Sequence, residues 1–313
     1  MKNCGEVASA IKEMRIRGAP LIGVAAAYGL ALTAYHSKAP DKKELIKQIH
    51  DSADILRKTR PTGANLFWAV DRVLKKTQET SGSVDAVARA VVDEAQKIAD
   101  EDVEINKKIG ENGSKLIQNG DAILTHCNAG AFATVEHGTA LGVIRTAWTQ
   151  NKRIKVYATE TRPTLQGARL TAYELKRDGI PITLVTDGAV GYLMSKRLVN
   201  KVVVGADRVV RDAVINKIGT YTIAVLAHEH GVPFHVAVPT SSFDLTHTSE
   251  DVVIEERNMD EVTHLGSERI APKGVGALNP AFDVTPLRYV SSIICERGVL
   301  SVGEFQELAR KSL

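Results

Sequence analysis

Beyond residue 120 the chain alternates short apolar segments with stretches of helical periodicity, and this alternation limits the possible fold more than any other feature. The first segment is a short apolar run with β-branched residues, which is typical of a buried parallel strand, and the others are similar strand-like runs. The segments are Ala122–Thr125, Ile154–Ala158, Ile182–Val185, Val202–Val204 and Phe234–Val238. The pattern predicts a doubly wound parallel sheet with helices on its faces.

Polar residues follow all of these segments. In chain order they are His126-Cys127-Asn128, Thr159-Glu160-Thr161-Arg162, Thr186-Asp187, Gly205-Ala206-Asp207-Arg208 and Pro239-Thr240-Ser241. In open α/β sheets the ligand crevice lies beyond the carboxyl ends of the strands. Turns are polar in general, but five polar turns in succession predict a site at this edge. After Gly130 we expect a helix, with Val135, Thr139 and Val143 on one face.

The sequence before residue 119 has helical periodicity throughout. The expected helices are Glu6–Met14, Ala19–Ala34, Glu44–Lys58, Leu66–Lys76 and Val84–Ile117. The second is apolar but shorter than the roughly 20 residues of a membrane span, so we expect a buried core helix. The predicted fold class is therefore α/β. A helical N-terminal domain, residues 1–118, precedes a Rossmann-like doubly wound parallel sheet domain, residues 119–313.

Charge and cysteine content narrow the functional classes. A net charge of +3 does not favour a nucleic-acid or membrane partner. Cys4, Cys127 and Cys295 lie far apart, which argues against a disulfide framework and for a reducing compartment. Charged residues occur from the start of the chain, unlike in a secretory signal peptide. We therefore expect a cytoplasmic protein.

Asp207 and the residues after it suggest acid–base chemistry beside a phosphate. Asp207 follows an apolar strand, and burial there would raise the pKa of its carboxyl group so that it can hold a proton. We expect Asn216, Lys217, Gly219 and Thr220 to open the next helix, whose N-terminus would suit a phosphate. Two plainer interpretations remain open, namely that Asp207 caps a helix and that Cys127 only packs in the core.

Other chemistries have weaker support. Neither the dinucleotide-binding glycine motif nor the P-loop motif occurs. The cluster His228, His230 and His235 invites a metal, but His228 and His230 would point to opposite sides of a helix end, so we expect no metal and no cofactor. A Cys–His hydrolase using Cys127 with His126 or His137 stays open. A thiol and a carboxyl group beside phosphate-binding groups suit proton transfer on a phosphorylated sugar.

Several motifs resemble those of the methylthioribose-1-phosphate isomerases. They are, in order, R-I-R-G-A-P, R-P-T-G-A-N-L-F-W-A, T-H-C-N-A-G, E-T-R-P-T-L-Q-G-A-R-L-T-A-Y-E-L, G-A-D-R, I-N-K-I-G-T and N-P-A-F-D-V-T-P. The resemblance spans essentially the whole chain. The broader family includes ribose-1,5-bisphosphate isomerase and regulatory subunits of a translation initiation exchange factor.

The resemblance implies an aldose–ketose isomerase of methionine salvage, converting 5-methylthioribose 1-phosphate to 5-methylthioribulose 1-phosphate. Two alternatives stay open: an isomerase of 5-deoxyribose 1-phosphate or ribose 1,5-bisphosphate, and a non-catalytic regulatory subunit. The resemblance places the catalytic pair at Cys127 and Asp207 and also implies a homodimer. It places substrate-binding positions at Arg17, Gly18, Ala19, Arg60, Gln166, Asn216 and Lys217. Relatives usually begin with a small β-rich segment, whereas this chain starts almost at its first helix.

Overall fold

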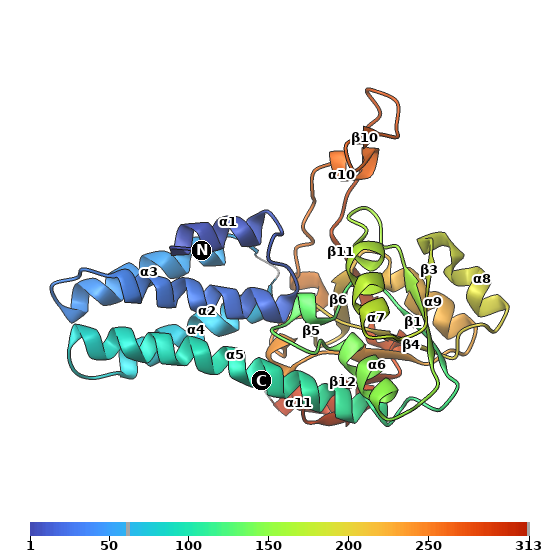
Figure 1. Ribbon diagram of the computed structural model, residues 1–313, viewed down its shortest axis with the longest axis horizontal. Helices are drawn as coiled ribbons and strands as arrows, with labels where there is room; N and C mark the ends of the chain where they lie inside the picture. Colours follow the sequence, from blue (N-terminus) through green and yellow to red (C-terminus); the bar gives the residue numbers. More distant parts are fainter. Residues whose placement is uncertain (61–62, 312–313) are drawn as a thin grey trace.

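The computed structural model describes residues 1–60 and 63–311 and has a helical part beside a sheet-containing part (Figure 1). The helical part contains α1 (Cys4–Lys12), α2 (Ala19–His36), α3 (Lys42–Arg57), α4 (Ala64–Glu79) and α5 (Val84–Ser114). Helices α3 and α5 begin where the sequence supplies caps: Asp41 accepts a hydrogen bond from the Glu44 amide at 2.9 Å, and Ser83 accepts one from the Ala86 amide at 3.3 Å. The predicted order of a helical region followed by a sheet domain is confirmed.

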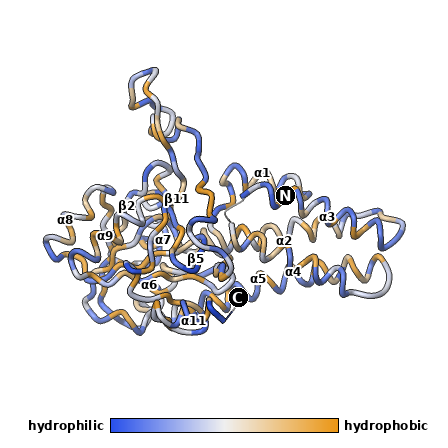
Figure 2. The backbone as a smooth tube through the Cα atoms, turned by 180° about the vertical axis from the view of Figure 1, so that it is seen from behind, coloured by the Kyte–Doolittle hydropathy of each residue, from blue (hydrophilic) through white to orange (hydrophobic). Residues whose placement is uncertain are grey.

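Helix α2 is the core of the helical part. Its small residues let α1, α3, α4 and α5 pack around it, and residues such as Ala26, Ala27 and Leu30 are fully buried. By length and composition α2 could also cross a membrane, a property that it shares with core helices of this kind. The tube in Figure 2 shows hydrophobic and hydrophilic residues alternating along the other helices, as amphipathic packing requires.

Helix α5 joins the two parts. Its first half packs on α2, whereas Ile109 near its end belongs to the core beneath the sheet. Asn112 also donates a hydrogen bond from Nδ2 to the carbonyl oxygen of Cys295, at 3.0 Å. One helix therefore contributes to both cores, and the division of the chain at residue 118 stays a prediction.

The main sheet has the strand order β13-β12-β7-β4-β1-β2-β3, and only the β12–β13 pair in it is antiparallel among the described residues. The strands are β1 (Ala122–Thr125), β2 (Lys155–Thr159), β3 (Ile182–Val185), β4 (Lys201–Val204), β7 (Phe234–Ala237), β12 (Ser292–Cys295) and β13 (Gly298–Leu300). The first five correspond to the predicted segments. From β1 the sheet extends through β2 to β3 on one side, and β4 pairs with β1 on the other side. The strand order therefore reverses between β1 and β4, and an open sheet places its ligand crevice at such a point.

Helices cover both faces of this sheet. Ile123 and Val203 face the core formed with α5 and α6 (Ala140–Thr149), while Leu124 and Val202 face the opposite core. Further helices of this domain are α7 (Ala172–Arg177), α8 (Val190–Ser195), α9 (Thr220–Glu229) and α11 (Val302–Lys311). Because neighbouring side chains alternate between two cores, the central strands are largely apolar, whereas the edge strand β3 leaves Thr183 and Leu184 exposed.

A second sheet, with strand order β11-β6-β5-β8, lies beside the carboxyl edge of the first and was not predicted. Its strands are β5 (Arg208–Val210), β6 (Ala213–Lys217), β8 (Phe243–Asp244) and β11 (Phe282–Pro286). The segment leading into β11 projects from the body in Figure 1 and carries α10 (Asp260–Thr263), β9 (His264–Leu265) and β10 (Glu268–Arg269).

Two local predictions were wrong. The expected helix directly after Gly130 is a short 3-10 turn, Ala131–Ala133, and α6 starts only at Ala140, because His137 and Gly138 have φ of 66° and 86°. Asn216 and Lys217 do not open a helix but end strand β6, which pairs with β11. Helix α9 starts after Gly219, whose φ of 101° separates it from that strand.

Candidate active site

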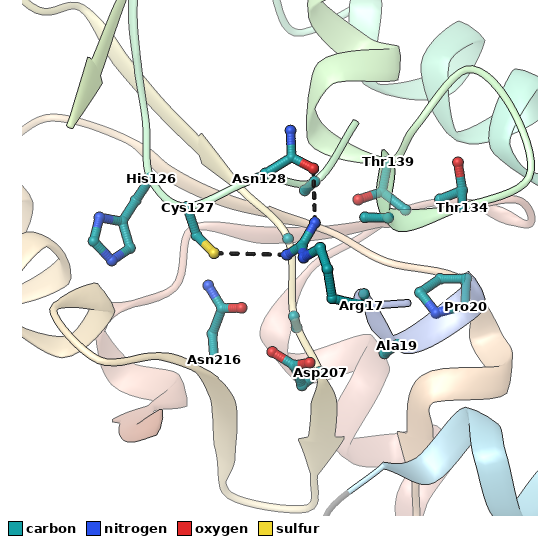
Figure 3. Close-up of a pocket in the computed structure, with 15 residues that line it drawn as sticks. Arg17, Ala19, Pro20, His126, Cys127, Asn128, Thr134, Thr139, Asp207 and Asn216 are labelled. Carbon is teal, nitrogen blue, oxygen red and sulfur yellow. Dashed lines mark hydrogen bonds between the residues drawn. The ribbon is translucent and has the colours of Figure 1, made fainter. Parts of the chain in front are cut away.

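A pocket lies where the start of α2 meets the carboxyl ends of β1 and β4 and the end of β6 (Figure 3). The lining residues are Arg17, Gly18, Ala19, Pro20, His126, Cys127, Asn128, Ala129, Ala133, Thr134, Thr139, Gly205, Ala206, Asp207 and Asn216. The pocket therefore lies at the sheet edge that the sequence predicts. Of the five polar turns, only those after β1 and β4 contribute residues to its lining. The turn after β2 supports it from behind, through Thr161 and Gln166.

Cys127 has a strained backbone at the end of β1. Its φ is 61°, in the left-handed region that a non-glycine residue rarely adopts. Three hydrogen bonds hold this conformation: its amide donates to Oγ1 of Thr161 at 2.9 Å, its thiol donates to Oε1 of Gln166 at 2.8 Å, and its carbonyl oxygen accepts from Oγ1 of Thr171 at 2.6 Å. Gln166 immediately precedes a π-helical turn, Gly167–Thr171, a feature that often occurs at functional sites.

Arg17 reaches the same pocket from the helical part. Its Nη1 donates to Oδ1 of Asn128 at 2.7 Å, and its Nη2 donates to Oε1 of Gln166 at 3.3 Å and lies 3.8 Å from Sγ of Cys127. Figure 3 shows the guanidinium group between Cys127 and Asn128. The next residue must be glycine, because Gly18 has φ of 93° and a Cβ there would lie 2.4 Å from Cα of Ala133. This close approach brings the N-terminus of α2 to the pocket.

Asp207 faces the pocket between β4 and β5. Burial raises the pKa of its carboxyl group, while Arg60, Lys217 and Arg17 oppose this shift through their positive charges. The predicted direction of the pKa shift is therefore confirmed. A carboxyl group with a raised pKa keeps its proton to a higher pH than a free aspartic acid and can donate it as a general acid.

Arg60 and Lys217 lie behind the pocket lining, on the ring of Phe282. The guanidinium carbon of Arg60 is 5.7 Å from the ring centroid and Nζ of Lys217 is 4.9 Å from it. Lys217 also donates to the carbonyl oxygen of Ala281 at 2.9 Å, and burial lowers its pKa, whereas electrostatic interactions with the acidic groups of Cys127 and Asp207 raise it. Arg60 is 7% exposed, and its Nε lies 3.4 Å from Oε2 of Glu255.

His126 is held as a neutral ring beside the pocket. A carbonyl oxygen can only accept, so Nε2 of His126 donates to Ile218 at 2.9 Å, and Nδ1 then accepts from Oγ1 of Thr159 at 2.6 Å. Burial lowers its pKa, which keeps the ring uncharged. Both ring nitrogens are thus engaged away from Cys127, which weakens the Cys–His hydrolase hypothesis. His137 hydrogen-bonds Thr146 at 3.1 Å and does not line the pocket.

The predicted site residues fall into two layers. Arg17, Gly18, Ala19, Cys127, Asp207 and Asn216 line the pocket, whereas Arg60, Gln166 and Lys217 stand directly behind it. Within the described residues no group of three or more His, Cys, Asp or Glu side chains is arranged to hold a metal ion. His235, one of the three histidines considered for a metal, is buried and hydrogen-bonds Ser292 at 2.8 Å.

Sequence reasoning missed Phe282 and Glu174, which both support the pocket. Phe282 lies in the motif N-P-A-F-D-V-T-P, and Glu174 lies in the motif that also contains Gln166. Glu174 is a buried carboxylate on α7 that accepts a hydrogen bond from Asn128 at 2.7 Å. In the sequence, Glu174 stands between the apolar residues Tyr173 and Leu175. This position could have indicated a buried and paired carboxylate, because buried charges are rare unless they are paired.

Comparison with known proteins gives consistent results over nearly the full chain. A family model described as the initiation factor 2 subunit family matches residues 15–302. Methylthioribose-1-phosphate isomerases of Thermosipho africanus and Acetivibrio thermocellus are 52% and 49% identical to this chain. Each alignment spans 96% of this chain, and it spans 87% and 89% of those relatives, respectively.

Two solved structures extend the comparison. The 5-methylthioribose 1-phosphate isomerase of Pyrococcus horikoshii is 46% identical, with a TM-score of 0.88 over 99% of this chain and 87% of that one. A protein of A. fulgidus described as translation initiation factor eIF-2B, subunit delta, is 48% identical, with a TM-score of 0.85 over 99% of this chain and 92% of that one. The chain therefore belongs to the initiation factor 2 subunit family.

Proposed function

We propose that this protein is an aldose–ketose isomerase that converts 5-methylthioribose 1-phosphate to 5-methylthioribulose 1-phosphate in methionine salvage. The observation that carries the proposal is the meeting of Cys127, Asp207 and Arg17 in one pocket. The relatives that are about half identical to the chain and are named as this isomerase support the same conclusion.

The proposed roles follow from the reaction. A phosphate ester at C1 blocks the free aldehyde, so the ring must open with the ester in place. Opening requires a proton at the ring oxygen, which we assign to Asp207, since burial raises the pKa of its carboxyl group. Isomerisation then moves the hydrogen of C2 to C1, while the C2 hydroxyl becomes a ketone and its proton replaces the one that Asp207 donated. We assign Cys127 to the carbon-to-carbon step because its thiol lies at the pocket wall.

The phosphate is placed at the start of α2. Arg17 supplies a cation, and the free backbone amides of the α2 N-terminus favour an anion. Gly18 and Ala19 contribute to this binding position, while Asn216 faces the sugar and Gln166 orients the thiol. Arg60 and Lys217 add positive charge from behind the lining.

A catalytic-pair experiment tests the proposal. Purified protein is incubated with 5-methylthioribose 1-phosphate, and ketose formation is followed for the wild type, Cys127→Ser and Asp207→Asn. Each substitution should lower kcat by about 10²–10⁴, since each removes a group that moves a proton or hydrogen. Near-normal turnover in a folded Cys127→Ser variant would return Cys127 to a packing role. Activity should survive a chelator, and loss restored by a divalent ion would contradict a metal-free reaction.

The second candidate is a non-catalytic regulatory subunit, which the name of the A. fulgidus structure favours. Complete inactivity of the wild type on 5-methylthioribose 1-phosphate, 5-deoxyribose 1-phosphate and ribose 1,5-bisphosphate would support it. Turnover of either alternative sugar alone would instead reassign the substrate. We further propose a cytoplasmic homodimer that acts without nucleic acid or a membrane.

A further inference from the structure

Glu174 is a buried carboxylate that does not line the pocket and has no role in the proposed reaction. It lies on α7, is 4% exposed, and accepts hydrogen bonds from Nδ2 of Asn128 at 2.7 Å and from the Ala131 amide at 2.8 Å. Nη2 of Arg145 donates to it at 2.7 Å. Two of these donors belong to the loop after β1, and the third is on α6. Because a buried carboxylate is costly unless it is paired and hydrogen-bonded, this arrangement indicates that Glu174 fixes the structure of that loop.

The task concerns the orientation of the Asn128 amide. An ionised carboxylate can only accept hydrogen bonds, so the nitrogen of the Asn128 side chain must face Glu174. Thr171 requires the same orientation, because its hydroxyl hydrogen is already donated to the carbonyl oxygen of Cys127 at 2.6 Å. The Thr171 oxygen can therefore only accept from Nδ2 of Asn128, at 3.2 Å.

With both neighbours of Nδ2 restricted to accepting, Oδ1 of Asn128 must point toward the pocket. There it accepts from Nη1 of Arg17 at 2.7 Å. The reversed amide would set its NH2 group against the guanidinium group, two donors facing each other, and Arg17 would lose this acceptor. The remaining polar contacts of Arg17 in the described structure, to Gln166 at 3.3 Å and Cys127 at 3.8 Å, are longer.

We propose that Glu174 is a positioning residue that fixes the Asn128 amide and thereby holds Arg17 in the geometry that binds the substrate phosphate. The inference rests on the proposed function of Arg17. It also explains why Gly130 is a glycine, since a Cβ there would lie 2.3 Å from Oε2 of Glu174. The carboxylate is thus packed directly against the loop that carries Cys127 and Asn128.

The test compares Glu174→Gln with the control Asp178→Asn. Glutamine keeps the volume of Glu174, but its amide can present a donor to Asn128 and so permits the reversed orientation. Asp178 is the other carboxylate bound to Arg145, at 2.6 Å from Nε, and contacts neither Asn128 nor the pocket lining. Both variants remove one negative charge from the surroundings of Arg145. Only Glu174→Gln also changes a hydrogen-bond partner of Asn128, and therefore only this variant should alter phosphate binding.

Glu174→Gln should raise KM by about tenfold or more with a smaller change in kcat, because a charge-assisted hydrogen bond to Arg17 is lost. The inhibition constant of inorganic phosphate should rise in parallel, while Asp178→Asn should leave both values near those of the wild type. Circular dichroism and the melting temperature verify folding. If Glu174→Gln does not fold, Thr171→Val removes the other acceptor and should raise KM in the same direction.

Unchanged KM and phosphate inhibition in the folded variant would overturn the positioning role, as would an equal effect of Asp178→Asn. Failure of the proposed function looks different: the wild type itself would not turn over the sugar phosphate. In that case calorimetric titration of inorganic phosphate into the wild type and both variants still tests the inference, since it requires no turnover. Phosphate affinity that is equal in all three proteins would refute it.

Discussion

Replacing Phe282 with leucine should weaken substrate binding although Phe282 does not line the pocket. Its ring is 3% exposed and holds the guanidinium group of Arg60 and the ammonium group of Lys217 at 5.7 and 4.9 Å from its centroid. Two like charges are thereby kept close to Asp207, on which both act electrostatically. Leucine keeps an apolar side chain at this position but removes the electron-rich face that attracts the cations.

The magnitude follows from these two contacts. A cation–π contact contributes about 0.5–1 kcal/mol when exposed and about 2 kcal/mol when desolvated, and both cations here are buried. Lys217 keeps its hydrogen bond to Ala281, so the larger loss should fall on Arg60. Together the two contacts stabilise the positions of the cations by about 1–3 kcal/mol. Losing this stabilisation should lower kcat/KM by roughly five- to hundredfold, mainly through a higher KM.

The assay needs a control for simple loss of core packing. Phe234 on β7 is 1% exposed, lies in a core of the main sheet and does not line the pocket. Phe234→Leu and Phe282→Leu should both lower the melting temperature, because each removes buried apolar volume. Only Phe282→Leu should change KM. Equal kinetics in the two variants, with both folded, would refute the reasoning that the Phe282 ring organises the cations.

Three further predictions concern charge, pH and assembly. Arg60→Ala should lower kcat/KM by roughly ten- to hundredfold, the value of a charge-assisted hydrogen bond of about 1.5–3 kcal/mol, and unchanged kinetics would make Arg60 structural. Burial raises the pKa of Asp102 to about 6, so the folded protein retains a proton that the unfolded chain releases as pH rises from about 4 to 6. In urea unfolding, Asp102→Asn should therefore have a free energy of unfolding about 2–3 kcal/mol above that of the wild type at pH values above 6. This difference should disappear below about pH 4. Light scattering should give twice the chain mass, and a monomer at micromolar concentration would contradict the homodimer.

The parts of the fold that local sequence determines were predictable. The parallel strands are short, largely apolar segments separated by helical stretches, and this alternation along the chain limits the topology. The second sheet was not, because β5 and β8 are two or three residues long and their pairing joins segments distant in sequence. The same long-range pairing of β6 with β11 turned Asn216 and Lys217 into strand residues.

The site shows the same division. Cys127 and Asp207 follow strands that the sequence reveals, so their approach to one sheet edge could be foreseen. The contributions of Phe282 and Glu174 depend on contacts across about 65 and 46 residues of chain, to Lys217 and Asn128 respectively. No periodicity encodes such contacts. Only the docking of α2 on the turn after β1, through the close approach of Gly18 to Ala133, brings Arg17 to Cys127.

The charges around the pocket bear on which sugar phosphate fits. Arg17, Arg60 and Lys217 supply at most three positive charges, and Glu255, which pairs with Arg60 at 3.4 Å, offsets one of them. Asp207 adds no charge when it holds a proton. Lys217 also interacts with the carboxylates of Asp283 and Glu261, so the balance of charge leaves enough positive charge for one phosphate group, which carries about −1.5 to −2 at neutral pH. A second phosphate at C5 would leave its charge unmatched in a partly buried site, at a large desolvation cost. The balance therefore favours a sugar with one phosphate over ribose 1,5-bisphosphate.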